Sequence, residues 1–192
     1  MMPKLRTLTL FILLTAAWLL PQPAAAQNSD VLTVSARAGL DGLYQQYAWT
    51  PVTVTVANSG PAVAGKLTVT RSAAPGSSAI LYEAPINLPT QSNKEITLYV
   101  YLSRFVNDLN VTLLDDNGNT LIATQTNALR LVDSDHLFYG VVTGNVGSLD
   151  FLQNITGGRP DAAVAYLTPD ALPDIAAAWR PLDVVVLSSI DS

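Results

Sequence analysis

The chain has 192 residues, of which 49% are hydrophobic and 13% are charged, and it contains no cysteine and a single histidine. Soluble domains average about 25% charged residues, so this composition excludes a highly charged disordered chain. The lack of cysteine excludes disulfides, thiolate metal sites and a cysteine nucleophile. The formal net charge of −5 argues against a protein that binds nucleic-acid phosphates.

Residues 1–26 are predicted to form a cleaved secretory signal peptide. Two basic residues precede an apolar run of 13 residues, Leu8–Leu20, which is interrupted only by threonine, and three alanines follow it. The run is shorter than the roughly 20 apolar residues of a membrane-spanning helix. With Ala24 and Ala26 at positions −3 and −1, we predict cleavage before Gln27, and we expect a secreted or cell-envelope protein.

Residues 27–132 have the period-two alternation of β-strands. Valines 52, 54 and 56 alternate with threonines, and turn residues separate one such stretch from the next. Seven short antiparallel strands over about 100 residues favour a β-sandwich of two sheets. The predicted strands are 31–37, 51–57, 65–71, 80–87, 94–101, 109–114 and 120–131.

The segment 115–119, Asp-Asp-Asn-Gly-Asn, admits two interpretations. Its oxygen-rich side chains resemble a calcium loop, but a calcium loop of the EF-hand type needs a distal bidentate glutamate and flanking helices. Asn117-Gly118 between two strands instead favours a type I′ hairpin turn. We therefore predict a turn and no metal site.

A resemblance supports this fold. Residues 49–61, Trp-Thr-Pro-Val-Thr-Val-Thr-Val-Ala-Asn-Ser-Gly-Pro, are followed by Gly-Lys-Leu-Thr-Val at residues 65–69. Together they resemble the second and third strands of bacterial immunoglobulin-like or fibronectin-like envelope domains. The resemblance implies a fold and no particular activity.

Three aromatic residues, Tyr44, Tyr47 and Trp49, lie before the second predicted strand, with two glutamines between the tyrosines. Aromatic and amide side chains on a sandwich loop can stack on sugars or contact a partner protein. The favoured interpretation is that these rings pack into the core, because large aromatic residues are usually well buried. The alternative makes them the candidate binding surface of the chain.

The pattern changes in residues 137–192, where three continuous apolar runs replace the alternation. Runs of this kind indicate strands buried on both faces of a parallel sheet. A short helix with Ser148 as its N-cap is predicted between the first two runs, and a helical turn between the last two. This order predicts a flavodoxin-like α/β module with right-handed crossovers. The runs are 137–143, 162–167 and 184–187, and the helical segments are 148–155 and 175–179.

The α/β module is expected to be truncated, because about 60 residues are too few for a doubly wound domain. Residues 179–187, Trp-Arg-Pro-Leu-Asp-Val-Val-Val-Leu, resemble the strand entry of the class I glutamine amidotransferase-like superfamily. In that superfamily the nucleophilic cysteine would lie beyond Ser192. The resemblance therefore implies a fold without carrying amidotransferase activity over, and we expect the chain to be the N-terminal part of a longer protein.

Residues 133–136 are predicted to be a linker. The 27–132 segment has six basic and seven acidic residues, whereas residues 133–192 have two basic residues and eight aspartates. Such a shift in charge indicates a domain boundary. Asp133, Asp135 and His136 could ligate a metal, but three ligands on one linker rarely suffice, so a solvated linker is the expectation.

The loop 144–148, Gly-Asn-Val-Gly-Ser, joins a predicted strand to a predicted helix. Backbone amides around Gly144, Gly147 and Ser148 could hold an anion. A plain strand-to-helix turn is the favoured interpretation, because the spacing matches neither a Walker A loop nor a dinucleotide-binding motif. Gly-x-Ser-x-Gly is also absent from the chain. The sequence therefore predicts no catalytic residues, no cofactor and no metal.

These observations favour an exported, non-catalytic interaction protein with an unknown protein or glycan partner. One alternative is the ectodomain of a larger membrane-anchored sensor or envelope protein. Another is the N-terminal part of a hydrolase or transferase whose catalytic residues lie beyond Ser192.

Overall fold

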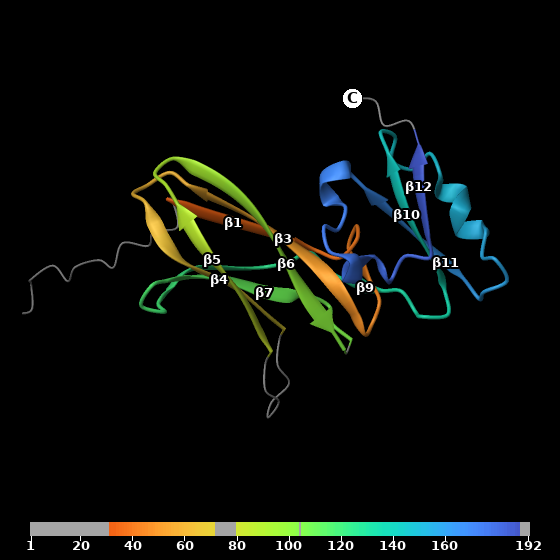
Figure 1. Ribbon diagram of the computed structural model, residues 1–192, viewed down its shortest axis with the longest axis horizontal. Coiled ribbons are helices and arrows are strands. Elements are labelled where there is room, and N and C mark those ends of the chain that lie inside the picture. The colour runs from red at the N-terminus through yellow and green to blue at the C-terminus, as the bar shows by residue number, and fades with distance from the viewer. Residues whose placement is uncertain (1–30, 72–79, 104, 189–192) are drawn as a thin grey trace, which may run out of the picture.

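The structure is a computed structural model that describes residues 31–71, 80–103 and 105–188. Its described part consists mostly of β-strands, with a few short 3-10 helices (Figure 1). The predicted signal peptide, with Ala24, Ala26 and Gln27 at its cleavage site, lies outside the described residues, as does Ser192. Within the described ranges no helix has the length and apolar character needed to cross a membrane.

Residues 31–132, here called the antiparallel region, form two larger antiparallel sheets. All seven predicted strands are present within a few residues of their expected bounds, except that the segment 120–131 is divided and not one strand. One sheet has the order β1-β3-β6, with β1 (Leu32–Ala38), β3 (Ala48–Asn58) and β6 (Ser92–Leu102). The other has the order β5-β4-β7-β8, with β4 (Val63–Arg71), β5 (Leu81–Leu88), β7 (Leu109–Asp115) and β8 (Thr120–Gln125).

Alternation along these strands places one row of side chains in a core shared by both sheets. Val54 of β3 and Leu67 of β4 are fully buried in this core, as is Val111 of β7. Thr53 and Thr55 point to the opposite face of β3 and remain partly exposed. Burying an aliphatic side chain of this size contributes about 1.5–3 kcal/mol, so this core is the main source of stability for the region.

The free edges of the two sheets lie close together on both sides. Strand β5 packs beside β6, and β1 packs beside β8. The Tyr82 hydroxyl accepts a hydrogen bond from the Tyr101 amide at 2.9 Å and donates one to the Tyr101 carbonyl at 3.3 Å. One side chain thus satisfies edge backbone groups of β6 that would otherwise be open to pairing with another strand.

The hairpin between β7 and β8 is confirmed, but the type I′ turn predicted for it is wrong. A type I′ turn needs a positive φ at both central residues, whereas in this loop only Gly118 has one, at +84°. The Asp115 amide donates to the Asn119 carbonyl at 2.9 Å, which closes a three-residue loop. The Asp115 carboxylate also accepts the amides of Asn117 and Asn119, and this side-chain cap favours the longer loop.

Residues 137–188, here called the parallel region, form a three-stranded sheet of order β11-β10-β12 in which both pairs are parallel. The strands match the predicted apolar runs: β10 (Leu137–Thr143), β11 (Ala162–Leu167) and β12 (Val184–Ser188). The central strand β10 is buried, with Phe138 and Val141 at 0% exposure. Strand β12 is an edge, so the expectation that all three runs are buried on both faces is wrong for it: Leu187 is 66% exposed.

The helix predicted at 148–155 is shorter than expected, whereas the helical turn predicted at 175–179 is present. Three 3-10 segments lie between the strands of the parallel sheet: η3 (Asp150–Asn154), η4 (Pro169–Ala171) and η5 (Ala176–Trp179). The predicted N-cap Ser148 is also wrong, because the cap position falls on Leu149 and carries no side-chain hydrogen bond. Gly147 before η3 and Gly157 after it both have positive φ, which leaves too few residues for a stable α-helix.

The two regions share a hydrophobic cluster. Leu40 and Leu43 of the antiparallel region, with Val132, pack against Phe138 and Leu167 of the parallel region. Leu43 lies in β2 (Leu43–Tyr44), which pairs in parallel with β9 (Arg130–Leu131) just before the junction. The cluster therefore crosses the predicted boundary at residue 132.

Candidate functional site

Tyr44, one of the three candidate binding residues, belongs to the core. Its side chain is 2% exposed, and its hydroxyl accepts a hydrogen bond from the buried Val106 amide at 2.8 Å. A phenol in this position satisfies a buried donor while its ring packs among apolar side chains. Tyr44 is therefore not part of a binding surface, and the core packing favoured by the sequence is found for this residue.

The other two candidates, Tyr47 and Trp49, do reach the surface. Tyr47 is 66% exposed and Trp49 is 37% exposed. Trp49 of β3 lies directly opposite Tyr101 of β6, with ring centroids 5.7 Å apart. Its ring also meets Tyr82 of β5 edge-on at 6.3 Å. Offset and edge-on arrangements of this kind hold aromatic rings in fixed positions.

Further exposed apolar side chains lie near Tyr47, Trp49 and Tyr101. Ile80, Leu81 and Phe105 are each more than half exposed, and they lie at the same end of the two sheets. We call the following set the aromatic surface: Tyr47, Trp49, Ile80, Leu81, Tyr101 and Phe105. Sequence reasoning missed four of the six. The alternation of β6 could have placed Tyr101 on the outer face, but nothing local indicated that three distant segments meet here.

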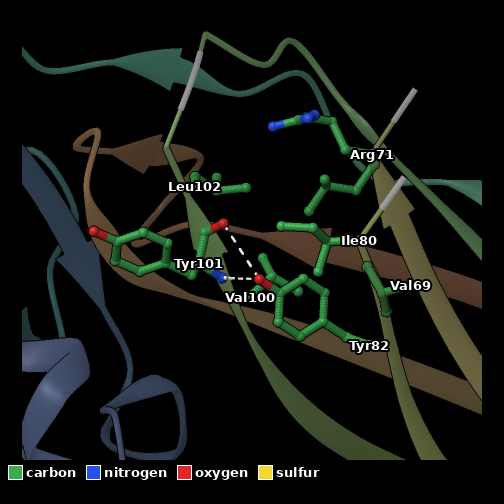
Figure 2. A pocket seen from close by; sticks show the side chains of 8 residues that line it. Val69, Arg71, Ile80, Tyr82, Val100, Tyr101 and Leu102 are labelled. Carbon is green, nitrogen blue, oxygen red and sulfur yellow. Dashed lines mark hydrogen bonds between the residues drawn. The ribbon is translucent and has the colours of Figure 1, made fainter. Parts of the chain in front are cut away.

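A small crevice lies beside the aromatic surface, as Figure 2 shows. Tyr82 reaches across to the backbone of Tyr101, while the Tyr101 ring points away from the crevice. The crevice holds about 10 Å³, enough for roughly one water molecule. A second hollow of about 210 Å³ joins Arg71 to Phe105. Its polar lining consists of Arg71, Asn107 and Asp108.

The candidate anion loop at Gly144, Gly147 and Ser148 folds as a turn. The Asn145 amide donates to the Thr143 hydroxyl at 3.2 Å, and the Ser148 amide donates to the Asn145 carbonyl at 3.2 Å. The Asp150 carboxylate lies beside Gly147, where it would repel an anion. The plain turn favoured by the sequence is thus present, and the Asp150 carboxylate disfavours an anion beside Gly147.

Of the predicted linker cluster, His136 is tied to the parallel region, whereas Asp133 and Asp135 are exposed. The His136 ring lies 3.8 Å from the Asp135 carboxylate, and the His136 amide donates to the Asp133 carbonyl. Arg159 donates to the His136 carbonyl at 2.8 Å and pairs in bidentate fashion with Asp183. In the described ranges, no three histidine or carboxylate side chains form a metal-binding group. The expectation of a freely solvated linker is therefore wrong for His136.

Comparison with known proteins gives distant structural neighbours and no match among curated proteins. A crystal structure of the CARDB domain of a Pyrococcus furiosus protein in complex with di-metal ions shares 15% identity over 54% of this chain and 90% of that one, with a TM-score of 0.36. The Pseudomonas fluorescens alkylpurine DNA glycosylase AlkC, bound to DNA with an abasic-site analogue, shares 13% identity and a TM-score of 0.35.

That second match covers 52% of this chain but only 30% of the glycosylase. At such low TM-scores neither likeness bears on function. A family model is more informative, because it matches residues 31–130, which cover most of the antiparallel region and more than half of the chain. The chain belongs to the family described as a domain of unknown function, DUF8726.

Proposed function

We propose that this chain is an exported, non-catalytic binding protein of the cell envelope or the extracellular space. Its aromatic surface would contact a partner protein. The observation that carries the proposal is the gathering of six exposed large apolar residues at one end of the antiparallel region. Contiguous apolar patches on soluble proteins commonly mark interaction sites.

The composition of the aromatic surface favours a protein partner. Tryptophan, tyrosine and arginine dominate binding energy at protein interfaces, and Trp49, Tyr101 and the neighbouring Arg71 supply all three. The exposed aliphatic residues Ile80 and Leu81 add area without hydrogen-bonding capacity for a sugar. A glycan is therefore the second candidate partner for the aromatic surface.

The finer fold assignment belongs to this proposal. We propose that the two antiparallel sheets form an immunoglobulin-like sandwich, which their common core supports. The parallel region would be the opening of a flavodoxin-like or amidotransferase-like module, and the strand order β11-β10-β12 supports that assignment. Its N-terminal 26 residues would direct export.

A second candidate function is the ectodomain of a larger membrane-anchored envelope protein. The open edge strand β12 favours it, because Val184, Val185 and Leu187 are all at least 39% exposed. Sheet edges of this kind are normally covered by other elements. An immunoblot of whole cells with antibodies against the antiparallel region, which reports the size of the native chain, separates the two candidates.

Site-specific photo-crosslinking tests the binding proposal. A benzophenone amino acid placed at Tyr47, within the aromatic surface, should give a discrete protein adduct in cells. The same group at Thr33, an exposed position on the outer face of β1, is the matched control and should give none. The Tyr47 adduct should disappear when Trp49 is changed to alanine, because Trp49 supplies the largest ring of the surface.

Two outcomes would count against the partner class or the surface. Equal adducts at Tyr47 and Thr33 would contradict a specific surface. Co-sedimentation of purified protein with insoluble envelope polysaccharide, lost in Trp49→Ala, would reassign the partner to a glycan.

A further inference from the structure

A cleft separates the outer face of the β1-β3-β6 sheet from the parallel region. It consists of two adjoining cavities of about 270 Å³ and 110 Å³. Both are lined by Pro51 and Thr53 of β3 and by Ala171 of η4, so they form one continuous space. Binding sites for small molecules occur preferentially where two structural units meet, and this cleft, which we call the inter-region cleft, approaches their usual size.

The walls of the inter-region cleft are fixed before any ligand arrives. The Tyr99 hydroxyl donates to the Asp174 carboxylate, and the Asp174 amide donates back to the same hydroxyl at 3.0 Å. Burial, together with the hydrogen bond to Asp174, raises the pKa of Tyr99 and keeps its proton available for this contact. The Tyr166 amide donates to the Asp41 carboxylate at 3.2 Å on the other side. A preformed site loses less entropy on binding.

Charged groups without partners lie at the two ends of the cleft. Arg37 lines the larger cavity and Asp170 lines the smaller one. Neither side chain makes a hydrogen bond or ion pair with the residues that the structure describes. Asp41 also lines the larger cavity, but its carboxylate is bound to the Tyr166 amide and makes no ion pair with Arg37.

Strand register gives the spacing between the two strands, β1 and β6, that carry the cleft-lining residues Arg37 and Thr97. Arg37 of β1 is opposite Thr53 of β3, which is opposite Thr97 of β6. Two inter-strand steps therefore separate Arg37 from Thr97, or roughly 10 Å at about 4.8 Å per step. Asp170 lines the same cavity as Thr97. The cleft thus presents a positive group and a negative group at its two ends, with the threonine hydroxyls between them.

We propose that the inter-region cleft binds a short zwitterionic peptide of about three residues. Three extended residues span roughly 10 Å, which matches the roughly 10 Å between β1, which carries Arg37, and β6, whose Thr97 lines the same cavity as Asp170. The guanidinium of Arg37 forms a bidentate pair with the terminal carboxylate, and the Asp170 carboxylate binds the terminal ammonium. Thr53 and Thr97 supply hydroxyls for the peptide backbone. The site is separate from the aromatic surface and does not depend on the function proposed for it.

Calorimetric titration of the purified protein with Gly-Gly-Gly and its blocked forms tests this site. We expect the free tripeptide to bind about tenfold more tightly than the N-acetylated form or the C-amidated form, because each block removes one charged contact. Arg37→Gln should abolish the preference for the free acid over the amide. Asp170→Asn should abolish the preference for the free amine over the acetylated form.

Arg130→Gln is the matched control, since Arg130 is exposed and does not line the cleft. It should bind all three peptides as the unmodified protein does. Equal affinity for free and blocked tripeptides would overturn the proposal, as would undetectable binding at millimolar peptide by a protein with an unchanged melting curve. The proposal would also be overturned if Arg37→Gln and Asp170→Asn both kept the unmodified protein's preference for the free tripeptide over its blocked forms.

Discussion

In the antiparallel region β5 lies against β6 and β1 lies against β8, whereas β12 of the parallel region is an open sheet edge in the described part of the chain. The first region satisfies edge backbone groups with its own Tyr82 side chain. In the second, Val184, Val185 and Leu187 are exposed. An antiparallel pair of sheets can cover its edges within about 100 residues, but three parallel strands joined by short 3-10 segments cannot.

The shared cluster shows which region depends on the other. Leu40 and Leu43 cover one face of the parallel sheet around Phe138 and Leu167. The large core of the antiparallel region, by contrast, contains no residue of the parallel sheet. The parallel region therefore takes part of its core from its neighbour. Four experiments test this and other differences between the two regions.

Separating the two regions should have the largest effect. Residues 133–192 alone should show no cooperative thermal transition, because the face around Phe138 loses Leu40 and Leu43. Residues 27–132 alone should still melt cooperatively, although at a lower temperature because Val132 becomes exposed. Circular dichroism melts of both pieces measure this, and a cooperative transition for residues 133–192 would remove the asymmetry between the regions.

Truncating one leucine in each region sharpens the comparison. Leu67→Ala removes a fully buried side chain of the antiparallel core and should cost about 2–5 kcal/mol of unfolding free energy. Leu187→Ala, at 66% exposure on the open edge, should change it by no more than about 0.5 kcal/mol. Urea titration of both variants gives the two values. A loss above about 2 kcal/mol for Leu187→Ala would mean that β12 is covered in solution.

Ion pairs in the two regions should also differ in how much they contribute to the free energy of unfolding. Arg159 forms two hydrogen bonds to Asp183 and a third to the His136 carbonyl, so Arg159→Lys should cost about 1–2 kcal/mol through loss of the bidentate geometry. The exposed pair of Lys66 and Glu83 in the antiparallel region should contribute less than about 1 kcal/mol, as Lys66→Ala would report. Urea titration of both variants tests the ranking, and equal losses would contradict it.

The smallest expected effect is a pH dependence at the β7–β8 hairpin. Hydrogen bonds from the Asn119 side chain and amide lower the pKa of Asp115 in the folded protein. The ionised carboxylate therefore stabilises the fold above its unfolded pKa, and this contribution disappears as pH falls through the folded pKa. Asp115→Asn should remove that part of the acid-limb melting profile. Asp116→Asn, in the same exposed turn, is the control and should retain it.

Much of the strand layout could be predicted from the sequence, because alternation depends on which face of each strand meets the core. Val52, Val54 and Val56 show this directly, since their threonine neighbours lie on the other face. The type I′ turn could not be predicted correctly, because the decisive interaction is the Asp115 side chain binding the amides of Asn117 and Asn119. Local dipeptide preference does not include that contact.

The candidate sites were harder to predict, because they depend on contacts between distant segments. Tyr44 and Tyr47 have the same side chain three residues apart, yet one is buried at 2% exposure and the other is 66% exposed. Only the pairing of β2 with β9 and the bond to Val106 decide that difference. The inter-region cleft was not predicted at all, since Arg37 and Asp170 are brought to one space only by the packing of both regions.

The strand order β11-β10-β12 also determines when the parallel sheet can form as the chain emerges from its N-terminus. Strand β10 is central, yet both of its partners follow it in the chain, and β12 lies about 40 residues further on. Until those partners emerge, β10 has one or both edges unpaired. Its buried face, by contrast, can pack on the antiparallel region as soon as Phe138 emerges. The N-to-C order of emergence therefore favours assembly of the later sheet on the antiparallel region.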